Sequence, residues 1–297
     1  MIPRNGHCAL CTLKKAYEPA LALGDADKAQ GFMKKLMQLY IDLPDGLDSN
    51  WLGPQVSKLF SDYYGVPDDR FKQDKIDSNA FVLPRLDGIR AKIQNARDPL
   101  YAALQFAILG NYLDFSALHG QVSYEKMDEL LNTAADYALD QAEYAKFRAD
   151  LEKGKKLLYL TDNAGEIGFD RLLCEEIERE YPGMEITVCV RGAAANNDAL
   201  REDAEQMGIP YRIIDNGTNL PSTPLDIISE EAKTAIRESD VIIAKGMGNV
   251  ESLYDCGYPV YYLFLVKCRR IMEYFNKPMM TPMFIKDTGR TPYYEKG

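Results

Sequence analysis

Residues 158–166 read LYLTDNAGE, an apolar run that ends in two adjacent oxygen-bearing side chains, Asp162 and Asn163. An amphipathic segment, residues 167–177, follows directly. This order predicts a buried strand that passes through a tight turn at Gly165 into a helix. Open α/β sheets hold their ligands beyond the carboxyl ends of parallel strands, where Asp162 and Asn163 would lie. The stretch therefore predicts an α/β fold and marks one edge of its sheet as a candidate site.

The two halves of the 297-residue chain differ in periodicity. Up to about residue 150, apolar residues recur at spacings of three and four, which predicts helices. The expected helices are residues 27–42, 49–64, 77–96, 99–113 and 123–149. Pro84 is expected to kink or split the third of them. We therefore expect an N-terminal all-helical domain over residues 1–150.

From residue 155 the pattern changes to short β-branched and aromatic runs separated by helical segments. Strands are expected at residues 156–161, 185–191, 211–215, 241–244, 260–265 and 283–286. Helices are expected at residues 166–180, 197–207, 229–238 and 267–275. Strand–helix alternation at these lengths predicts βαβ units and a parallel-rich sheet. Residues 151–297 are therefore expected to form a Rossmann-like α/β domain that carries the site.

The composition narrows the functional classes. A net charge of −10 argues against a nucleic-acid partner, which would require a basic surface. The longest apolar runs, such as residues 260–266, are too short to span a bilayer, and residues 1–6 contain no apolar stretch of the signal-peptide type. We therefore expect a cytoplasmic protein with neither a membrane nor a nucleic-acid partner, while its oligomeric state stays open.

Polar side chains follow three of the expected strands. The first strand ends in Asp162 and Asn163, the second is followed by Asn197 and Asp198, and the strand at 241–244 runs into residues 245–249, KGMGN. These ends share one edge of a parallel sheet, so the side chains can converge. Carboxylate and amide oxygens suit a hard cation such as Mg²⁺ or Mn²⁺. The pattern predicts a metal site next to a phosphate site.

Within this site we expect Asp162, Asn163 and Asp198 to hold the cation. Lys245 could hold a phosphate oxygen, and the glycines of residues 245–249 would let backbone N–H groups approach it. Each feature also has an ordinary explanation, because Asp and Asn make turns, Asp198 could cap a helix, and residues 245–249 could form a plain loop. The convergence on one sheet edge favours the site. Residues 245–249 match neither of the common nucleotide-binding glycine motifs.

Two further features lie in the N-terminal half. Gly110 and Asn111 end an expected helix, which fits either a helix C-cap or a site residue. Cys8 and Cys11 have the C-x-x-C spacing that suits zinc, an iron–sulfur site or a thiol–disulfide couple. A second such pair is missing from the sequence, and Cys256 and Cys268 are possible partners through the fold. A soft-metal or redox site of Cys8 and Cys11 with Cys268 is one hypothesis. A reduced, partly buried pair is the alternative.

The motifs resemble a known family, the metal-dependent damage-control phosphatases, long labelled domain of unknown function 89. The resemblance is carried by residues 162–166 with Asp170, 197–198 with 202–204, 245–249 with Glu251, and 110–111 with 114–115. It covers most of the chain, with the motifs in order. The cysteines of the C-x-x-C pair and the Lys267-Cys268 pair resemble the stand-alone microbial branch. The chain departs from the family pattern at residues 193–196 and 221–224.

The resemblance implies a helical domain packed on a Rossmann-like domain and hydrolysis of phosphate monoesters of small metabolites. It implies a divalent cofactor, Mn, Mg, Co or Ni, held by Asp162, Asn163 and Asp198. The residues that it places on the substrate or phosphate side, or elsewhere in the site, are Asn111, Asp114, Lys245, Glu166, Asn197 and Asn249. Glu166 and Asp198 both remain candidates for the base that activates water, and Asp162 remains a candidate nucleophile.

Two other functions stay open. A Rossmann-like sheet would also fit an S-adenosylmethionine-dependent carboxyl methyltransferase, although Asp162, Asn163 and Asp198 would then lack a role. A metal- or redox-binding protein that uses Cys8 and Cys11 is the third hypothesis.

Overall fold

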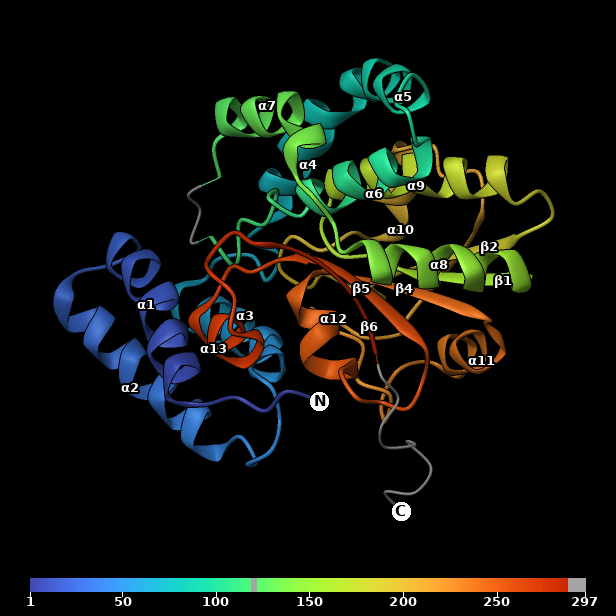
Figure 1. Ribbon diagram of the computed structural model, residues 1–297. Helices are drawn as coiled ribbons and strands as arrows, with labels where there is room; N and C mark the ends of the chain where they lie inside the picture. Colours follow the sequence, from blue (N-terminus) through green and yellow to red (C-terminus); the bar gives the residue numbers. More distant parts are fainter. Residues whose placement is uncertain (119–121, 288–297) are drawn as a thin grey trace.

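The computed structural model describes residues 1–118 and 122–287 and contains one six-stranded sheet with helices on both faces (Figure 1). The strands are β1 (Lys156–Leu160), β2 (Glu185–Val190), β3 (Arg212–Asp215), β4 (Val241–Lys245), β5 (Val260–Leu265) and β6 (Pro282–Lys286). All six lie within one or two residues of the expected positions. Their order in the sheet is β3-β2-β1-β4-β5-β6.

The first five strands pair in parallel, and only β6 runs antiparallel, against β5. This arrangement confirms the expected Rossmann-like, parallel-rich α/β fold. The order of strands reverses between β1 and β4, which lie side by side with Leu160 opposite Ala244. Ligands of open α/β sheets bind in the crevice at such a reversal. Asp162 and Lys245 therefore lie at the expected binding edge.

Helices form most of the N-terminal half and alternate with the strands thereafter. In the first half they are α1 (Gly6–Ala22), α2 (Ala26–Asp42), α3 (Gly53–Tyr64), α4 (Lys72–Val82), α5 (Leu86–Gln94), α6 (Pro99–Gly110), α7 (Tyr124–Asn132) and α8 (Gln141–Lys153). In the second half they are α9 (Glu166–Glu180), α10 (Arg201–Gln206), α11 (Glu230–Glu238), α12 (Gly246–Leu253) and α13 (Arg269–Phe275). Across the described ranges, no helix is long and apolar enough to cross a membrane.

Several helix boundaries differ from the sequence-based expectation. The helix expected at 77–96 is divided into α4 and α5 by a 3₁₀ turn that contains Pro84, as the missing N–H of proline requires. The single helix expected at 123–149 is wrong, because Asp140 begins a separate helix, α8, by accepting hydrogen bonds from two of its first N–H groups. A helix from residue 197 is also wrong, since α10 begins at Arg201 and Asp198 does not cap it.

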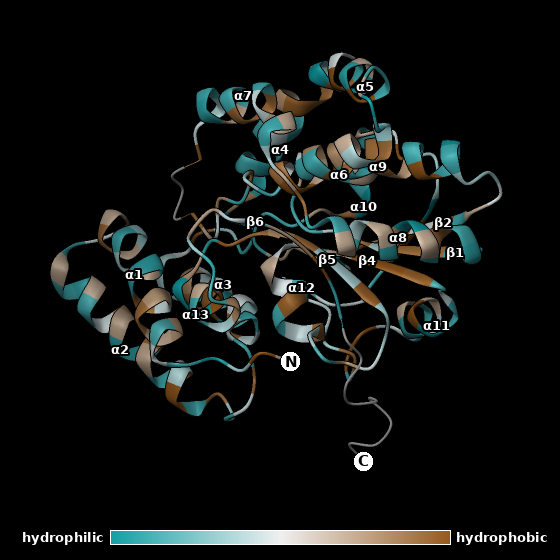
Figure 2. Cartoon of the chain, viewed as in Figure 1, coloured by the Kyte–Doolittle hydropathy of each residue, from teal (hydrophilic) through white to brown (hydrophobic). Residues whose placement is uncertain are grey.

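The sheet is apolar on both faces, and each face has its own cover (Figures 1 and 2). Alternate residues of the strands pack against α6, α8 and α9 on one face and against α11, α12 and α13 on the other. The first of these cores joins the two halves of the chain, because Ile108 and Phe147 lie in it together with Tyr159 and Tyr261. Helices α1, α2 and α3 enclose a smaller core around Phe32 and Phe60. A division into domains at residue 150 stays a prediction.

Candidate active site

The loop after β2 crosses the end of β1 and brings two sequence motifs together. Asn163 and Asp198 form an isolated antiparallel bridge, in which Ala164 N–H donates to the Asn197 carbonyl (2.9 Å) and Ala199 N–H to the Asp162 carbonyl (2.7 Å). Asp198 therefore belongs to this bridge and not to a helix. The predicted metal ligands Asp162, Asn163 and Asp198 are therefore neighbours, and all three are buried.

Asn111 connects the helical half to this cluster. Its side-chain amide donates to Asp162 Oδ2 (2.9 Å) and to both oxygens of Glu166 (3.1 and 3.0 Å), while its Oδ1 accepts from Leu265 N–H in β5 (3.0 Å). Asn163 Nδ2 donates to the same oxygen of Asp162 (2.8 Å) and to Glu166 Oε2 (2.6 Å). Asn111 ends α6, as the helix-cap alternative requires, and it also contacts the candidate site.

Two carboxylate oxygens of the cluster accept no hydrogen bond from any described residue. They are Oδ1 of Asp162 and Oδ1 of Asp198. The second oxygen of Asp162 accepts from Asn111 and Asn163, and the second oxygen of Asp198 accepts from Arg191 Nε. Burial and the nearby Asp198 carboxylate raise the pKa of Asp162 well above its usual range. Burial raises the pKa of Asp198 to about 7, against the attraction of Arg191. Unpaired hard oxygens with mutual repulsion fit a divalent cation, which would relieve both.

Lys245 lies beneath the carboxylate cluster and not at its surface. The ammonium donates to the Ala107 carbonyl (2.7 Å), Glu166 Oε1 (2.6 Å) and Asp170 Oδ1 (2.7 Å), and the side chain is fully buried. Burial works to lower the pKa of Lys245, but the two carboxylates outweigh it and raise the pKa. All three protons are engaged, so this arrangement differs from the expectation that Lys245 holds a phosphate oxygen.

Lys267 is a buried cation of the site that the strand-end argument did not select. It donates to the Asn111 carbonyl and to Asp114 Oδ2, each at 2.6 Å. Burial works to raise the pKa of Asp114, but Lys267 and the Ala117 N–H hold it below its usual value. Lys245 ends β4, and Lys267 closely follows β5. This shared position at the end of a strand is the sequence signal that could have identified Lys267.

Arg191, the residue directly after β2, is a second buried cation that was missed. Its Nε donates to Asp198 Oδ2 (2.7 Å) and its Nη1 to the Ser222 carbonyl (3.0 Å), Thr223 Oγ1 (3.1 Å) and Asn249 Oδ1 (3.3 Å). Asn249 in turn donates to the carbonyls of Thr161 (3.1 Å) and Lys245 (2.7 Å). Asn249 therefore joins the ends of β1 and β4 and helps to hold Arg191 in place.

Residues 245–249 do not form a plain loop, because α12 begins at Gly246. Gly246 has a φ of +76°, and a Cβ there would lie 1.9 Å from Asp162 Oδ2. Only glycine allows this left-handed backbone and this close approach to a carboxylate. Asn197, the remaining predicted site residue, donates to Asn163 Oδ1 (2.9 Å) and to the Leu113 carbonyl (3.1 Å), so it orients Asn163.

The cysteines Cys8, Cys11 and Cys268 form a separate group between α1 and α13, and all three are free. Burial raises the pKa of Cys268 to about 12, and the Glu251 carboxylate and the thiols of Cys8 and Cys11 add smaller increases. In the described part of the chain, however, no three His, Cys, Asp or Glu residues are arranged to hold a metal ion. A soft-metal or redox role for this group stays a prediction.

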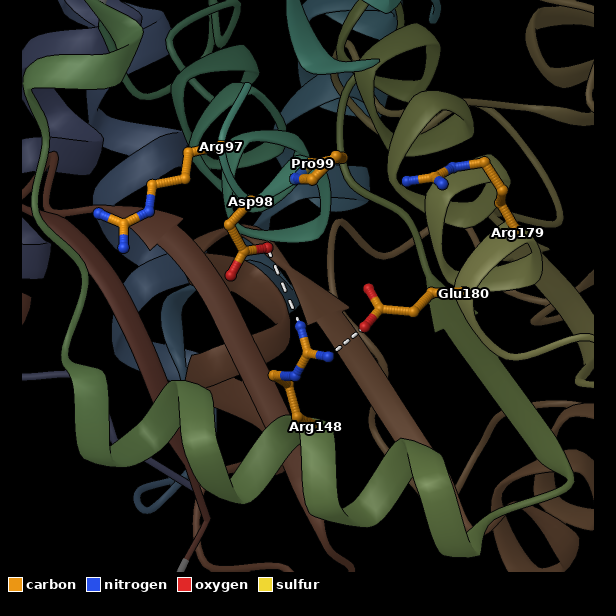
Figure 3. A pocket seen from close by; sticks show the side chains of 6 residues that line it. All are labelled: Arg97, Asp98, Pro99, Arg148, Arg179 and Glu180. Atoms are coloured by element: carbon orange, nitrogen blue, oxygen red, sulfur yellow. Dashed lines mark hydrogen bonds and ion pairs between the residues drawn. The ribbon is translucent and has the colours of Figure 1, made fainter. Parts of the chain in front are cut away.

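The surface also has a hollow of about 430 Å³, and Figure 3 shows the side chains that line it. It is lined by Arg97, Asp98, Pro99, Arg148, Arg179 and Glu180. Five of these residues lie at or just before the start of α6 or at the end of α9, and Arg148 lies in α8, whereas Asn111 and Glu166 lie at the opposite ends of α6 and α9. The hollow is therefore remote from the residues selected by the sequence.

The sheet is Rossmann-like, and buried Asp, Asn, Lys and Arg side chains gather where its strand order reverses. These two features are typical of α/β enzymes that bind a ligand at this edge of the sheet. A family model described as the damage-control phosphatase ARMT1-like domain matches residues 5–281, and the chain belongs to this family. Membership in this family suggests a metal cofactor for the chain and supports a phosphatase role.

Relatives from archaea agree with this assignment. The chain is 28% identical over 270 residues to a damage-control phosphatase from Archaeoglobus fulgidus, covering 89% of this chain and 92% of that one. It is 30% identical over 214 residues to the damage-control phosphatase PH1575 from Pyrococcus horikoshii, covering 71% and 72%. The crystal structure of PH1575, a DUF89 family protein, aligns with a TM-score of 0.83 at 24% identity, over 97% of this chain and 100% of that one, and so shows the fold.

Proposed function

We propose that the chain hydrolyses phosphate monoesters of small metabolites with the help of a divalent cation. The observation that carries the proposal is that the buried residues Asp162 and Asp198, next to Asn163, each keep one carboxylate oxygen that accepts no hydrogen bond from the described residues. Asp162, Asn163 and Asp198 would hold the cation. When bound, the cation supplies Lewis acidity that withdraws electron density from the phosphoryl group and offsets its charge.

The remaining residues have different tasks in this proposal. Glu166 accepts from Asn111, Asn163 and Lys245, so both of its oxygens are occupied and it acts as a positioning residue. Asp198 is the candidate base for the attacking water in the alternative in which Asp162 and Asn163 alone hold the cation, because its Oδ1 is then free and burial raises its pKa to about 7. Attack by Asp162 itself, with a covalent phosphoryl intermediate, is the competing mechanism.

Trapping of a covalent intermediate separates the two mechanisms. Direct attack by water forms no acyl phosphate on the protein. Attack by Asp162 forms an acyl phosphate on Asp162, which borohydride reduces to homoserine in acid-quenched protein, where mass spectrometry of the digested protein detects it.

The function itself is tested by turnover of p-nitrophenyl phosphate and of a panel of sugar phosphates and phosphorylated cofactor fragments. The protein is first stripped with a chelator and then supplied with Mn²⁺, Co²⁺, Ni²⁺ or Mg²⁺. We expect activity to disappear with the chelator and to return with at least one cation. Full activity after removal of metal would contradict the metal assignment. Calorimetric titration that detects S-adenosylmethionine binding and no Mn²⁺ binding would favour the methyltransferase alternative instead.

A further inference from the structure

The guanidinium of Arg191 is fixed on two sides and unpaired on the third. Asp198 accepts from Nε, and Ser222, Thr223 and Asn249 accept from Nη1. Nη2 is buried without a hydrogen-bond partner among residues 1–118 and 122–287 and lies 4.0 Å from Asp162 Oδ1. Leaving a buried cationic N–H group unpaired is costly, and such a group points to a ligand.

We propose that Arg191 Nη2 donates to a phosphoryl oxygen of the substrate and thereby selects an anionic phosphate, an inference that rests on the proposed function. Arginine presents its donors in a rigid fork that matches the oxygens of phosphate. Because Nε and Nη1 are held by the protein, the remaining nitrogen is oriented before the substrate arrives. It faces the same space as the unpaired oxygen of Asp162.

The charges of the site explain why an anionic substrate needs this group. Asp162, Asp198, Glu166 and Asp114 all lie near one another and would repel a phosphate. Lys245 donates its three protons to protein acceptors, and Lys267 donates to two. Arg191 combines a buried positive charge with a terminal nitrogen that has no protein acceptor in the described residues.

A purely structural role for Arg191 predicts a different result. If Arg191 only held Asp198 in place through Nε, replacing Arg191 would weaken cation binding. The affinity for phosphate would then fall by no more than the affinity for the cation. If Nη2 binds the phosphoryl group, phosphate affinity falls while cation affinity is largely kept. The two quantities can be measured separately on the same protein, without turnover.

The test uses Arg191→Lys, which keeps the positive charge but loses the fork. Calorimetric titration gives the affinity for Mn²⁺ and then, with Mn²⁺ bound, the affinity for inorganic phosphate. We expect phosphate affinity to fall at least about tenfold, as for loss of one hydrogen bond to a charged group, with Mn²⁺ affinity within about threefold of the wild type. Arg97→Ala, which removes an exposed arginine of the remote hollow, should leave both affinities and the activity unchanged.

Unchanged phosphate affinity in Arg191→Lys, or a parallel loss of both affinities, would overturn the inference while the phosphatase proposal stands. Wild-type protein that binds neither Mn²⁺ nor phosphate would overturn the proposed function and this inference with it. If Arg191→Lys fails to fold, a crystal structure of the wild type with Mn²⁺ and inorganic phosphate decides the matter. Nη2 farther than hydrogen-bonding distance from every phosphate oxygen would then refute the assignment.

Discussion

Two groups, each of one arginine and two carboxylates, lie near opposite ends of the antiparallel helices α6 and α9 in different surroundings. At one end Arg148 pairs with Glu180 and lies 3.9 Å from Asp98, with 41%, 25% and 41% of these side chains exposed (Figure 3). Near the other end Arg191 pairs with Asp198 and lies 4.0 Å from Asp162, with 2%, 4% and 8% exposed. Both groups place an arginine between two carboxylates.

The difference in solvent access gives the two groups different chemistry. Water screens the exposed group, so its charges interact weakly and its pairs contribute little to stability. In the buried group the charges interact strongly, which raises the pKa of Asp162 and Asp198 and leaves unpaired oxygens that a cation can use. Composition alone therefore does not make a site. The following predictions test this contrast, from the largest expected effect to the smallest.

Removal of the buried ammonium in Lys245→Met should destabilise the protein most. Glu166 and Asp170 would remain buried without their cation, and breaking a buried pair of this kind costs about 3–5 kcal/mol. Urea unfolding of the metal-free protein measures the change in the free energy of unfolding. The double variant Lys245→Met/Asp170→Asn should recover part of the loss, because one buried negative charge is removed. Wild-type stability in Lys245→Met would show that this charge network does not stabilise the fold.

Removal of a predicted metal ligand in Asp162→Ala should mainly lower kcat. Such an interaction is most needed in the transition state, and losses of about 10²–10³-fold are typical of single electrostatic stabilisers. Steady-state turnover of p-nitrophenyl phosphate with saturating Mn²⁺ provides the measurement. Near-normal kcat in a variant that folds normally would remove Asp162 from the mechanism.

Cation affinity should fall as the pH is lowered. The ligand is the ionised carboxylate, and burial raises the pKa of Asp198 to about 7, so a proton competes with the cation below this pH. Between pH 8 and pH 6 we expect a loss of about tenfold in Mn²⁺ affinity from Asp198 alone. Calorimetry in two buffers of different ionisation enthalpy would also detect the released proton. Asp198→Asn should flatten the dependence, and an equal slope in both proteins would contradict the assignment.

Substitution in the exposed group around Arg148 should have the smallest effect on stability and activity. Arg148→Ala removes an ion pair that is screened by water, so the free energy of unfolding should change by no more than about 1 kcal/mol. The activity should equal that of the wild type, because the hollow around Arg148 is remote from the carboxylate cluster. A loss of activity as large as in Asp162→Ala would show that this hollow takes part in the reaction.

The sequence was sufficient for the order of strands and helices in the second half of the chain. Strand ends were predicted to within one or two residues, because alternating short apolar runs and helical segments are local features of the chain. The same patterns placed Asp162, Asn163 and Asp198 at one sheet edge. Helix ends such as that at Asn132 were missed, since they depend on single capping residues and on packing.

The roles of the cations required the tertiary structure. Lys245 was expected to face a phosphate but contacts Ala107, Glu166 and Asp170, which no spacing rule brings together. Lys267 contacts Asn111, which is 156 residues away in the sequence. Arg191 keeps one unpaired nitrogen because Thr223 and Asn249 lie where they accept hydrogen bonds from its Nη1.

By itself, then, the sequence determined the fold class and the residue types gathered at the carboxyl edge of the sheet, because periodicity and strand ends depend on residues that are neighbours in the chain. Only the tertiary structure decided which charges are paired, because pairing in a buried site depends on side chains that distant segments bring within about 3 Å of one another.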